Sequence, residues 1–426
     1  MKTIDANTII NREKLSPLQW VVFILGFFVF FCDGLDTGII GFVAPALLDD
    51  WGITKPQLAP VLSAALVGMS IGAIISGPLA DKFGRKGVIV FTSLLFSIFT
   101  ILCGFANSTQ DLMIYRFITG VGLGAAMPNI STIVSEYMPV KRKAFLTGLA
   151  GCGFMLGISC GGVLSAYLLE SYGWAKVIII GGSIPLILVV ALLLKLPEST
   201  QYLITRHQQG KAQRILENIQ GHSFQEPVKL VLTQSETASD ENPVKVVLGK
   251  YLWGSSMLWL CCFTSLLVFY LLTSWMPTIL KTAGFSTQQF SLIAAIFPFG
   301  GVIGATIMGW YMDKLNPTTV IKYSYLIAFG LFIIAGSGEL KYFLVRSYYL
   351  LNWCFTRWCT VFITATCSYV LSSSMPRGWS FMDAWYRSYR CNFRRFLWFA
   401  HFHFQPKLKR YFLYSSNTNL HLIYCT

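Results

Sequence analysis

Long apolar runs separated by short polar segments dominate the chain. A helix needs roughly 20 mostly apolar residues to cross a bilayer. Segments of this kind cover residues 18–43, 57–79, 87–106, 110–136, 144–169, 174–195, 251–275, 286–310 and 318–336. A polar stretch from Pro197 to Lys250 separates the first six segments from the last three. The pattern therefore predicts an all-α polytopic membrane protein whose first half is a bundle of six helices.

Composition supports this class and argues against two others. Only 12% of the 426 residues are charged and 54% are hydrophobic, whereas soluble domains carry about 25% charged residues. An ordinary soluble globular protein is therefore excluded. The net charge of +14 would suit a nucleic-acid-binding protein, but such a protein gathers its basic residues on one polar face. Here they lie between apolar runs, so we expect a lipid bilayer and no nucleic acid as partner.

Lysine and arginine are distributed unevenly between the two sides of the predicted membrane. The basic side holds Lys2, Arg12, Lys14, Lys82, Arg85, Lys86, Lys141, Arg142, Lys143, Arg206, Lys211, Arg214, Lys229, Lys245 and Lys250. The other side holds only Lys55, Lys176 and Lys281. Basic loops stay in the cytoplasm, so residues 1–16 and 197–250 are predicted to be cytoplasmic. The first sixteen residues lead directly into a full-length span without a small-residue cleavage signature, so we expect this span to be retained in a multi-pass protein of the inner membrane.

The strongest local motif joins the second and third spans. Residues 77–86 read Gly-Pro-Leu-Ala-Asp-Lys-Phe-Gly-Arg-Lys. In so short a loop, Gly77 and Gly84 would supply close approach and backbone freedom, Asp81 would cap or pair, and Arg85 and Lys86 would hold the loop in the cytoplasm. The motif resembles the loop between helices two and three of the major facilitator superfamily, and the resemblance implies a gating loop.

Later segments carry the same resemblance. Arg116 is followed by spaced glycines, as in the fourth helix of that superfamily. Gly120 and Gly124 are one helical turn apart and permit close packing, whereas Arg116 is an intramembrane cation that needs a partner or a water-filled cavity. Asp313 and Lys314 end a degraded second copy of the basic loop, placed where an internal repeat would put it. The resemblance implies two six-helix bundles, of which about nine to ten helices are recognisable.

Two acids of the first span, Asp33 and Asp36, lie three residues apart and so on one face of a helix. Leaving both ionised in lipid would be prohibitive, so they are predicted to face a central cavity. Burial and a like-charged neighbour favour a protonated carboxyl, and a group that gains and loses a proton as water access changes is what proton coupling requires. The alternative is a bent, water-accessible helix end with ordinary solvated acids.

The sequence Asp33-Gly-Leu-Asp36, with the Gly-Phe-Val-Ala-Pro-Ala that follows it, is similar to the aromatic acid:proton symporter family. Members of this family import compounds such as benzoate and hydroxybenzoates. The resemblance implies that Asp33 and Asp36 are the transport and coupling acids, that Arg116 and Glu136 are fourth-helix charges needed for transport, and that Asp81 with its glycines forms the gating loop. We expect a monomer that moves a small aromatic carboxylate by alternating access, with the proton as coupling ion and no cofactor.

Other functions stay open on the sequence alone. Sugar porters of the same superfamily carry a related Gly-Tyr-Asp in the first helix and the Pro-Glu-Ser that here occupies residues 197–199, so a proton-coupled carrier for a sugar or another metabolite is the second hypothesis. A membrane receptor without transport is the third. An enzyme is not expected, because no nucleophile, base and orienting group occur at usable spacing. His401 and His403 lack a third ligand for a metal.

The chain is predicted to divide into five parts. Residues 1–16 form the N-terminus, 17–196 the first bundle, 197–250 the central loop, and 251–340 the first three helices of a second bundle. The last part, 341–426, holds eleven basic residues and a single acid, Asp383, and lacks the small-residue pattern of the earlier spans.

Three explanations compete for this last part of the chain: a basic tail, unusual spans, or translation in a shifted reading frame. Scattered Cys, Trp, Arg and Ser without periodicity favour the third, which would make the chain a non-functional transporter. Reading the other two frames of the gene beyond codon 340 tests the third explanation, because a shifted frame should restore apolar helices.

Overall fold

The computed structural model describes residues 2–11, 14–222, 228–231 and 252–314, together with residues 323, 326, 327 and 330. The chain divides into two compact units, one of residues 1–236 and 261–365, the other of residues 237–260 and 366–426. The contacts that follow all lie within the first unit. The predicted ninth span, 318–336, and the part 341–426 lie outside the described residues, apart from the four single positions.

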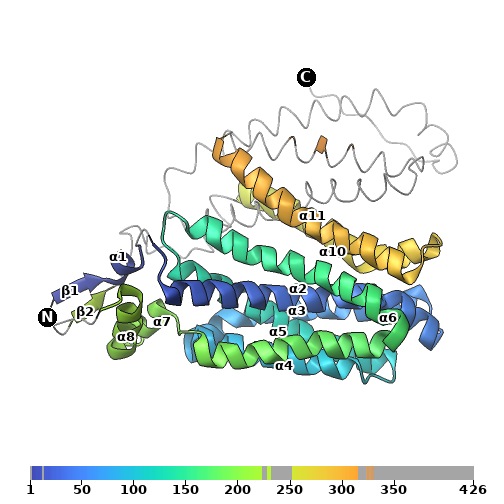
Figure 1. Ribbon diagram of the computed structural model, residues 1–426, viewed down its shortest axis with the longest axis horizontal. Helices are drawn as coiled ribbons and strands as arrows, with labels where there is room; N and C mark the ends of the chain where they lie inside the picture. The colour runs from blue at the N-terminus through green and yellow to red at the C-terminus, as the bar shows by residue number, and fades with distance from the viewer. Residues whose placement is uncertain are drawn as a thin grey trace. The chain divides into compact units, whose positions relative to one another are not determined.

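Long helices make up most of the described chain (Figure 1). They are α2 (Pro17–Trp51), α3 (Lys55–Phe83), α4 (Arg85–Cys103), α5 (Thr109–Tyr137), α6 (Lys143–Lys195), α10 (Leu252–Thr282) and α11 (Thr287–Lys314). Seven helices of the described chain are long and apolar enough to cross a membrane. The helix α6 contains two predicted spans, because Gly173 has a non-helical backbone with φ 76°. Eight of the nine predicted spans are therefore confirmed.

Short elements gather at the end of the bundle where α2 begins, which we call the basic end. They are α1 (Ala6–Ile10), α7 (Thr200–Thr205), α8 (Gln209–Gln220) and the strands β1 (Lys2–Asp5) and β2 (Val228–Val231). The two strands pair in parallel, with Lys2 opposite Val228 and Asp5 opposite Val231. This small sheet, built from the N-terminus and the central loop, is an addition to the predicted all-α fold (Figure 1).

Helix ends follow local sequence signals. Ser16 caps α2 in a reciprocal capping box with Gln19, and Pro17 occupies the first helical position, where its missing N–H costs nothing. The same helix ends at Gly52 in the left-handed conformation, with φ 61°. The helix α2 therefore continues eight residues beyond the predicted span, which ended at residue 43.

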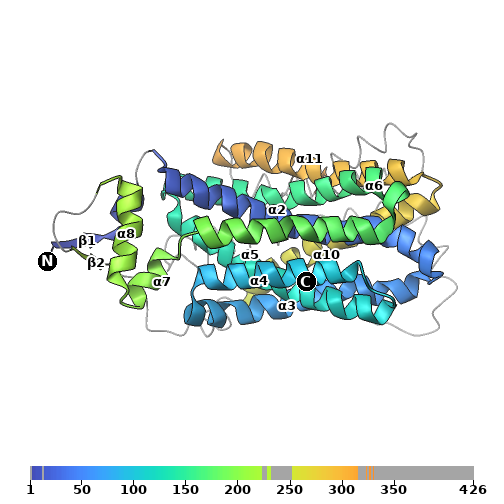
Figure 2. The ribbon, with the colours of Figure 1, turned by 60° about the horizontal axis from the view of Figure 1, so that its bottom comes forward.

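Small residues allow the helices to pack closely. The helices α2 to α6 run side by side in Figures 1 and 2. A Cβ atom at Gly120 of α5 would lie 2.1 Å from the carbonyl oxygen of Ala65 in α3, and one at Gly157 of α6 would lie 2.0 Å from that of Phe31 in α2. In a bilayer, helices associate through such close van der Waals contact rather than through hydrophobic burial. The predicted packing role of Gly120 is thus confirmed.

Candidate functional site

A buried ion pair connects the first and fourth predicted spans. The Nη1 atom of Arg116 in α5 donates to both carboxylate oxygens of Asp36 in α2, at 3.2 and 3.0 Å. The hydroxyl of Thr100 in α4 donates to the same carboxylate. The exposed fractions of the two charged side chains are 4% and 1%. A buried ion pair needs additional hydrogen bonds to offset its desolvation. Thr100 supplies one here, whereas Nε of Arg116 has no partner among the described residues.

Asp33 lies one turn earlier on α2 and is as deeply buried, with 1% of its surface exposed. In the described part of the chain, neither of its carboxylate oxygens accepts a hydrogen bond, and the hydroxyl of Thr37 beside it is also without a partner. An ionised carboxylate without a partner is costly at such a position. The two acids that the sequence placed on one face therefore differ: Asp36 is paired and Asp33 is not.

Further polar side chains are buried on the helices α4 and α5. Ser93, Ser97 and Thr100 are buried along one face of α4, and Thr119 of α5 is fully buried, with no hydrogen-bond partner for its hydroxyl among the described residues. Sequence reasoning missed these residues. The spacing of four and then three between Ser93, Ser97 and Thr100 was the available signal, because it places hydroxyls on one side of an apolar helix.

Glu136 lies far from this buried cluster, at the last turn of α5. Residues 116 and 136 are twenty positions apart, or about 30 Å along a helix. Glu136 pairs with Arg85, and the hydroxyl of Ser199 donates to its other oxygen at 2.6 Å. Arg116 and Glu136 both lie on α5, the fourth predicted span, as the sequence indicated. Their partners differ, because Glu136 reaches the α3–α4 junction.

Glu198 organises this junction. Its Oε1 atom accepts the backbone N–H groups of Arg85 at 2.8 Å and of Lys86 at 3.0 Å. The hydroxyl of Tyr137 donates to the carbonyl oxygen of Glu198 at 2.6 Å. The Pro-Glu-Ser segment thus fastens the start of α4 to the end of α5, a role that the sequence did not reveal.

The predicted gating loop is not a ten-residue loop. The helix α3 continues to Phe83 and α4 begins at Arg85, so Gly84 alone lies between them. Gly84 has φ 84°, and a Cβ atom there would lie 2.4 Å from Oε2 of Glu198, which confirms its predicted role. Close packing does not require glycine at position 77, because no described atom lies within 4 Å of a Cβ placed there.

The remaining predicted residues have weaker structural roles. The carboxylate of Asp81 forms no ion pair or hydrogen bond with the described residues, so the expected cap or pair is not found there. Its backbone carbonyl instead accepts from Arg206 at 2.7 Å. Asp313 and Lys314 end α11, and their side chains lie outside the described part.

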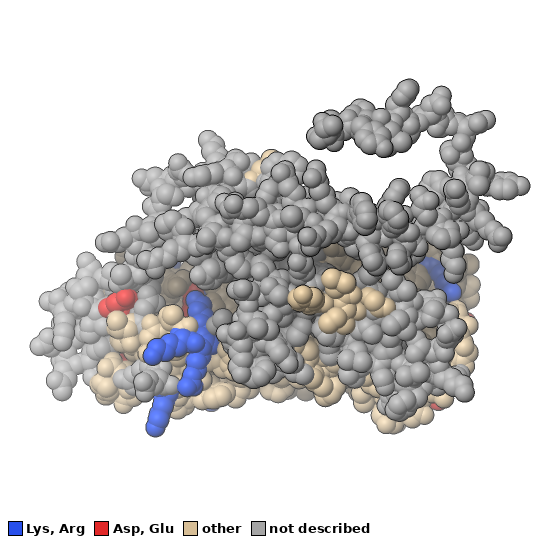
Figure 3. Space-filling view, turned by 90° about the horizontal axis from the view of Figure 1, so that it is seen from above, with Lys and Arg blue, Asp and Glu red and all other residues tan. Residues whose placement is uncertain are grey.

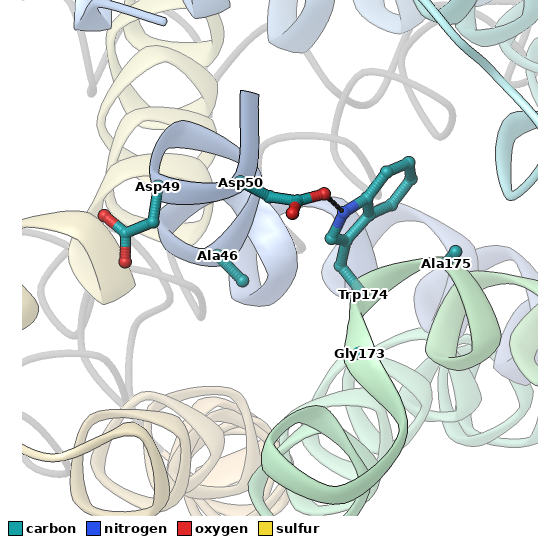
Figure 4. A pocket seen from close by; sticks show the side chains of 6 residues that line it. All are labelled: Ala46, Asp49, Asp50, Gly173, Trp174 and Ala175. Carbon is teal, nitrogen blue, oxygen red and sulfur yellow. Dashed lines mark hydrogen bonds between the residues drawn. The ribbon is translucent and has the colours of Figure 1, made fainter. Parts of the chain in front are cut away.

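The opposite end of the bundle has a hollow of about 570 Å³ (Figure 4). There Asp50 accepts a hydrogen bond from the indole N–H of Trp174 at 2.9 Å, while Asp49 points away from that ring (Figure 4). Asp49 pairs with Lys281 of α10, whose ammonium also donates to the carbonyl of Pro45 at 3.0 Å. The lining contains two acids and no basic side chain, so it would repel a carboxylate ligand.

Comparison with known proteins decides the family. The model of the Major Facilitator Superfamily matches residues 26–384. The chain belongs to the major facilitator superfamily. The match continues past residue 340 and so includes the first part of the segment that the sequence set apart. The solved structure of the xylose transporter XylE from E. coli, in a partially occluded inward-open conformation, shares the fold, with a TM-score of 0.64 at 18% identity over 84% of this chain and 89% of that one.

Relatives in this superfamily support the narrower resemblance seen in the sequence. The chain is 43% identical over 330 residues to the 4-hydroxybenzoate transporter PcaK of Pseudomonas aeruginosa, covering 77% of this chain and 74% of the relative. It is 36% identical over 334 residues to the gallate transporter of Pseudomonas putida, covering 78% and 74%. It is 34% identical over 322 residues to the benzoate transport protein of Acinetobacter baylyi, covering 74% and 69%. The predicted resemblance to aromatic acid transporters is thus confirmed.

Proposed function

We propose that this protein imports an aromatic carboxylate of the benzoate or hydroxybenzoate type together with a proton. The named relatives transport aromatic acids, which supports the cargo. The observation that carries the coupling is the unequal pairing of two buried acids one turn apart on α2. A carrier that couples uptake to protons needs a carboxyl that can change its protonation state inside the membrane, beside a cation that can attract the anion.

The two acids have different parts in this proposal. Asp33 carries the proton, because its carboxyl has no cation as partner among the described residues and is neutral whenever the cavity is closed to water. Arg116 gives the region its positive charge, and Asp36 with Thr100 holds the guanidinium in place. An arriving carboxylate shares Arg116 with Asp36, and the proton on Asp33 offsets the charge that the anion brings, so binding both leaves the net charge of the site unchanged. Closing the site with Asp33 protonated therefore costs less than closing it around the anion with Asp33 ionised.

The proposed movement is alternating access. The two six-helix bundles that the superfamily resemblance implies rock about a site near mid-membrane, so that the cavity opens first to one side and then to the other. The basic end faces the cytoplasm of a bacterial inner membrane, because lysine and arginine concentrate there. The protein acts as a monomer, with the proton as its coupling ion.

Uptake of labelled 4-hydroxybenzoate tests the proposal. Cells without their own carrier would express the chain, and uptake would be measured with and without a protonophore. We expect the protonophore to abolish accumulation, and Asp33→Asn and Asp36→Asn to reduce uptake at least tenfold. Glu170→Gln is the matched control, because Glu170 is an exposed acid on α6.

Competition identifies the cargo. Unlabelled benzoate and gallate should compete with the labelled compound, whereas xylose should not. Uptake that resists the protonophore, or that survives loss of both acids, contradicts proton coupling. Competition by a sugar alone would favour the second hypothesis, a metabolite carrier of the same superfamily.

A further inference from the structure

A second hollow, of about 490 Å³, lies at the basic end where α3, α4, α7 and α8 meet. Its lining combines three basic side chains with one acid and two aromatic rings, namely Lys86, Lys211, Arg214, Glu198, Phe83 and Tyr202. In Figure 3, a group of lysine and arginine side chains is visible toward this end of the molecule, and further basic atoms are visible toward the opposite end. The transport path proposed above uses neither Lys211 nor Arg214.

The positive charge of this hollow is not neutralised from within. The ion pairs of the described chain involve Arg85, Arg116 and Lys281, so Lys211 and Arg214 pair with no described acid. The acid that lines the hollow, Glu198, already accepts three backbone N–H groups through Oε1. An anion entering the hollow would therefore meet unpaired cations and an acid whose charge is offset by hydrogen bonds.

The spacing of apolar and basic residues along α8 places the basic residues beside the hollow. Ala212, Leu216 and Ile219 are buried, which leaves Lys211 and Arg214 on the exposed side. The ammonium of Lys86 is held near the hollow by the carbonyl oxygen of Leu193 at 2.9 Å. Three cations from two helices thus surround one concave surface.

Apolar side chains beside the hollow indicate which anion would occupy it. Phe83, in the lining, is 60% exposed, and Leu194, next to the residue that holds Lys86, is 75% exposed. On a membrane helix such exposed apolar side chains face acyl chains. A free anion would gain no binding free energy from these apolar side chains. A phospholipid, in contrast, would place its charged headgroup among the cations and its acyl chains on the apolar surface.

We propose that this hollow binds the phosphate headgroup of an anionic phospholipid. The lipid bridges α8 to the start of α4 through its phosphate oxygens, and so holds the central loop against the α3–α4 junction. Each basic side chain near a membrane surface contributes about 1 kcal/mol to binding an anionic lipid. The site is independent of which solute the protein carries.

Thermal unfolding of the full 426-residue chain in a neutral detergent tests this site. Phosphatidylglycerol, phosphatidylcholine and inorganic phosphate would each be titrated against the unfolding midpoint. We expect phosphatidylglycerol alone to raise the midpoint in a saturable manner. The double variant K211Q/R214Q should weaken the apparent affinity about thirtyfold, and each single variant about fivefold. The matched control is K141Q/R142Q, which removes the same charge from exposed residues at the same end but outside the hollow.

Each contrary outcome rejects the proposal. An equal loss of lipid response in the two double variants would mean that general surface charge attracts the lipid. Equal protection by inorganic phosphate would identify a site for a soluble anion. Because Lys211 and Arg214 are exposed, their variants should unfold at an unchanged midpoint without lipid, and this comparison separates lost binding from lost folding. The readout is unfolding, so failure of the proposed transport activity would not affect it.

Discussion

At the scale of single residues, Asp33 and Asp36 show how one motif contains two different chemical situations. Both side chains are buried on the same side of α2. Asp36 has a guanidinium and a hydroxyl as partners, whereas Asp33 has neither among the described residues. The cost of substituting each acid should therefore differ, because one substitution breaks an ion pair and the other does not.

We predict that Asp36→Asn destabilises the folded protein by about 3 to 5 kcal/mol, since it leaves Arg116 charged and buried without its partner. Asp33→Asn keeps the shape of the side chain and should change stability by less than about 1 kcal/mol. Denaturant unfolding in detergent measures both values. In a double-mutant cycle, Arg116→Gln should recover part of the loss caused by Asp36→Asn. Equal destabilisation by the two single variants would show that the pairing seen here is not formed.

At the scale of elements, the α3–α4 junction depends on a single residue. Gly84 joins two helices with a backbone that almost only glycine adopts, φ 84° and ψ 156°. Glu198 packs against it and accepts N–H groups from the first turn of α4. The junction is thus fixed by backbone conformation and by an acid from a distant segment, not by the residues of a flexible loop.

Gly84→Ala should therefore destabilise the protein by about 1 to 3 kcal/mol through backbone strain, with a further loss from displacement of Glu198. Gly77→Ala is the control, because a Cβ there meets open space and alanine is the better helix former. Unfolding of both purified variants in detergent checks the difference. If the two alanine variants were equally stable, strain at Gly84 would not be what shapes the junction.

The same junction shows how far a sequence motif can be interpreted. Its glycines and basic residues indicated the family. A short connection between two spans permits few residue types, so such a motif is specific. The motif could not reveal the partner of Arg85, since Glu136 is fifty-one positions away and Glu198 farther still. Which side chains meet depends on where each helix ends along the axis of the bundle. A single sequence does not encode these relative positions in any local pattern.

At the scale of the molecule, contacts join α2 and α10 at the end opposite the basic end. Lys281 bridges the carboxylate of Asp49 and the carbonyl of Pro45. One turn earlier along α2, a Cβ atom at Gly41 would lie 2.7 Å from the carbonyl oxygen of Thr273. In the proposed transport cycle, this contact separates when the cavity opens toward that end.

We expect Asp49→Asn and Lys281→Gln to shift the balance of conformations toward opening at that end, by no more than about fivefold, because a partly exposed ion pair contributes less than about 1 kcal/mol. The labelling rate of a cysteine at position 46, with a maleimide that cannot cross the membrane, would report the shift. Labelling of the chain without that cysteine gives the background. The exchanged pair D49K/K281D should return the rate toward that of the parent, and a rate that none of these variants alters would argue against a role for the pair.

The sequence by itself determined the membrane class, eight spans within the described chain, the family, and the presence of charged residues inside the membrane. It could do so because a bilayer requires long apolar runs and makes every intramembrane charge costly. Only the tertiary structure decided that Asp36 pairs with Arg116 whereas Asp33 has no ion pair among the described residues, that Glu136 pairs with Arg85, and that the N-terminus pairs with the central loop in a small sheet. These facts depend on which helices are neighbours and on how the helices are shifted relative to one another along the bundle axis. Packing between distant segments determines both the neighbours and the shift.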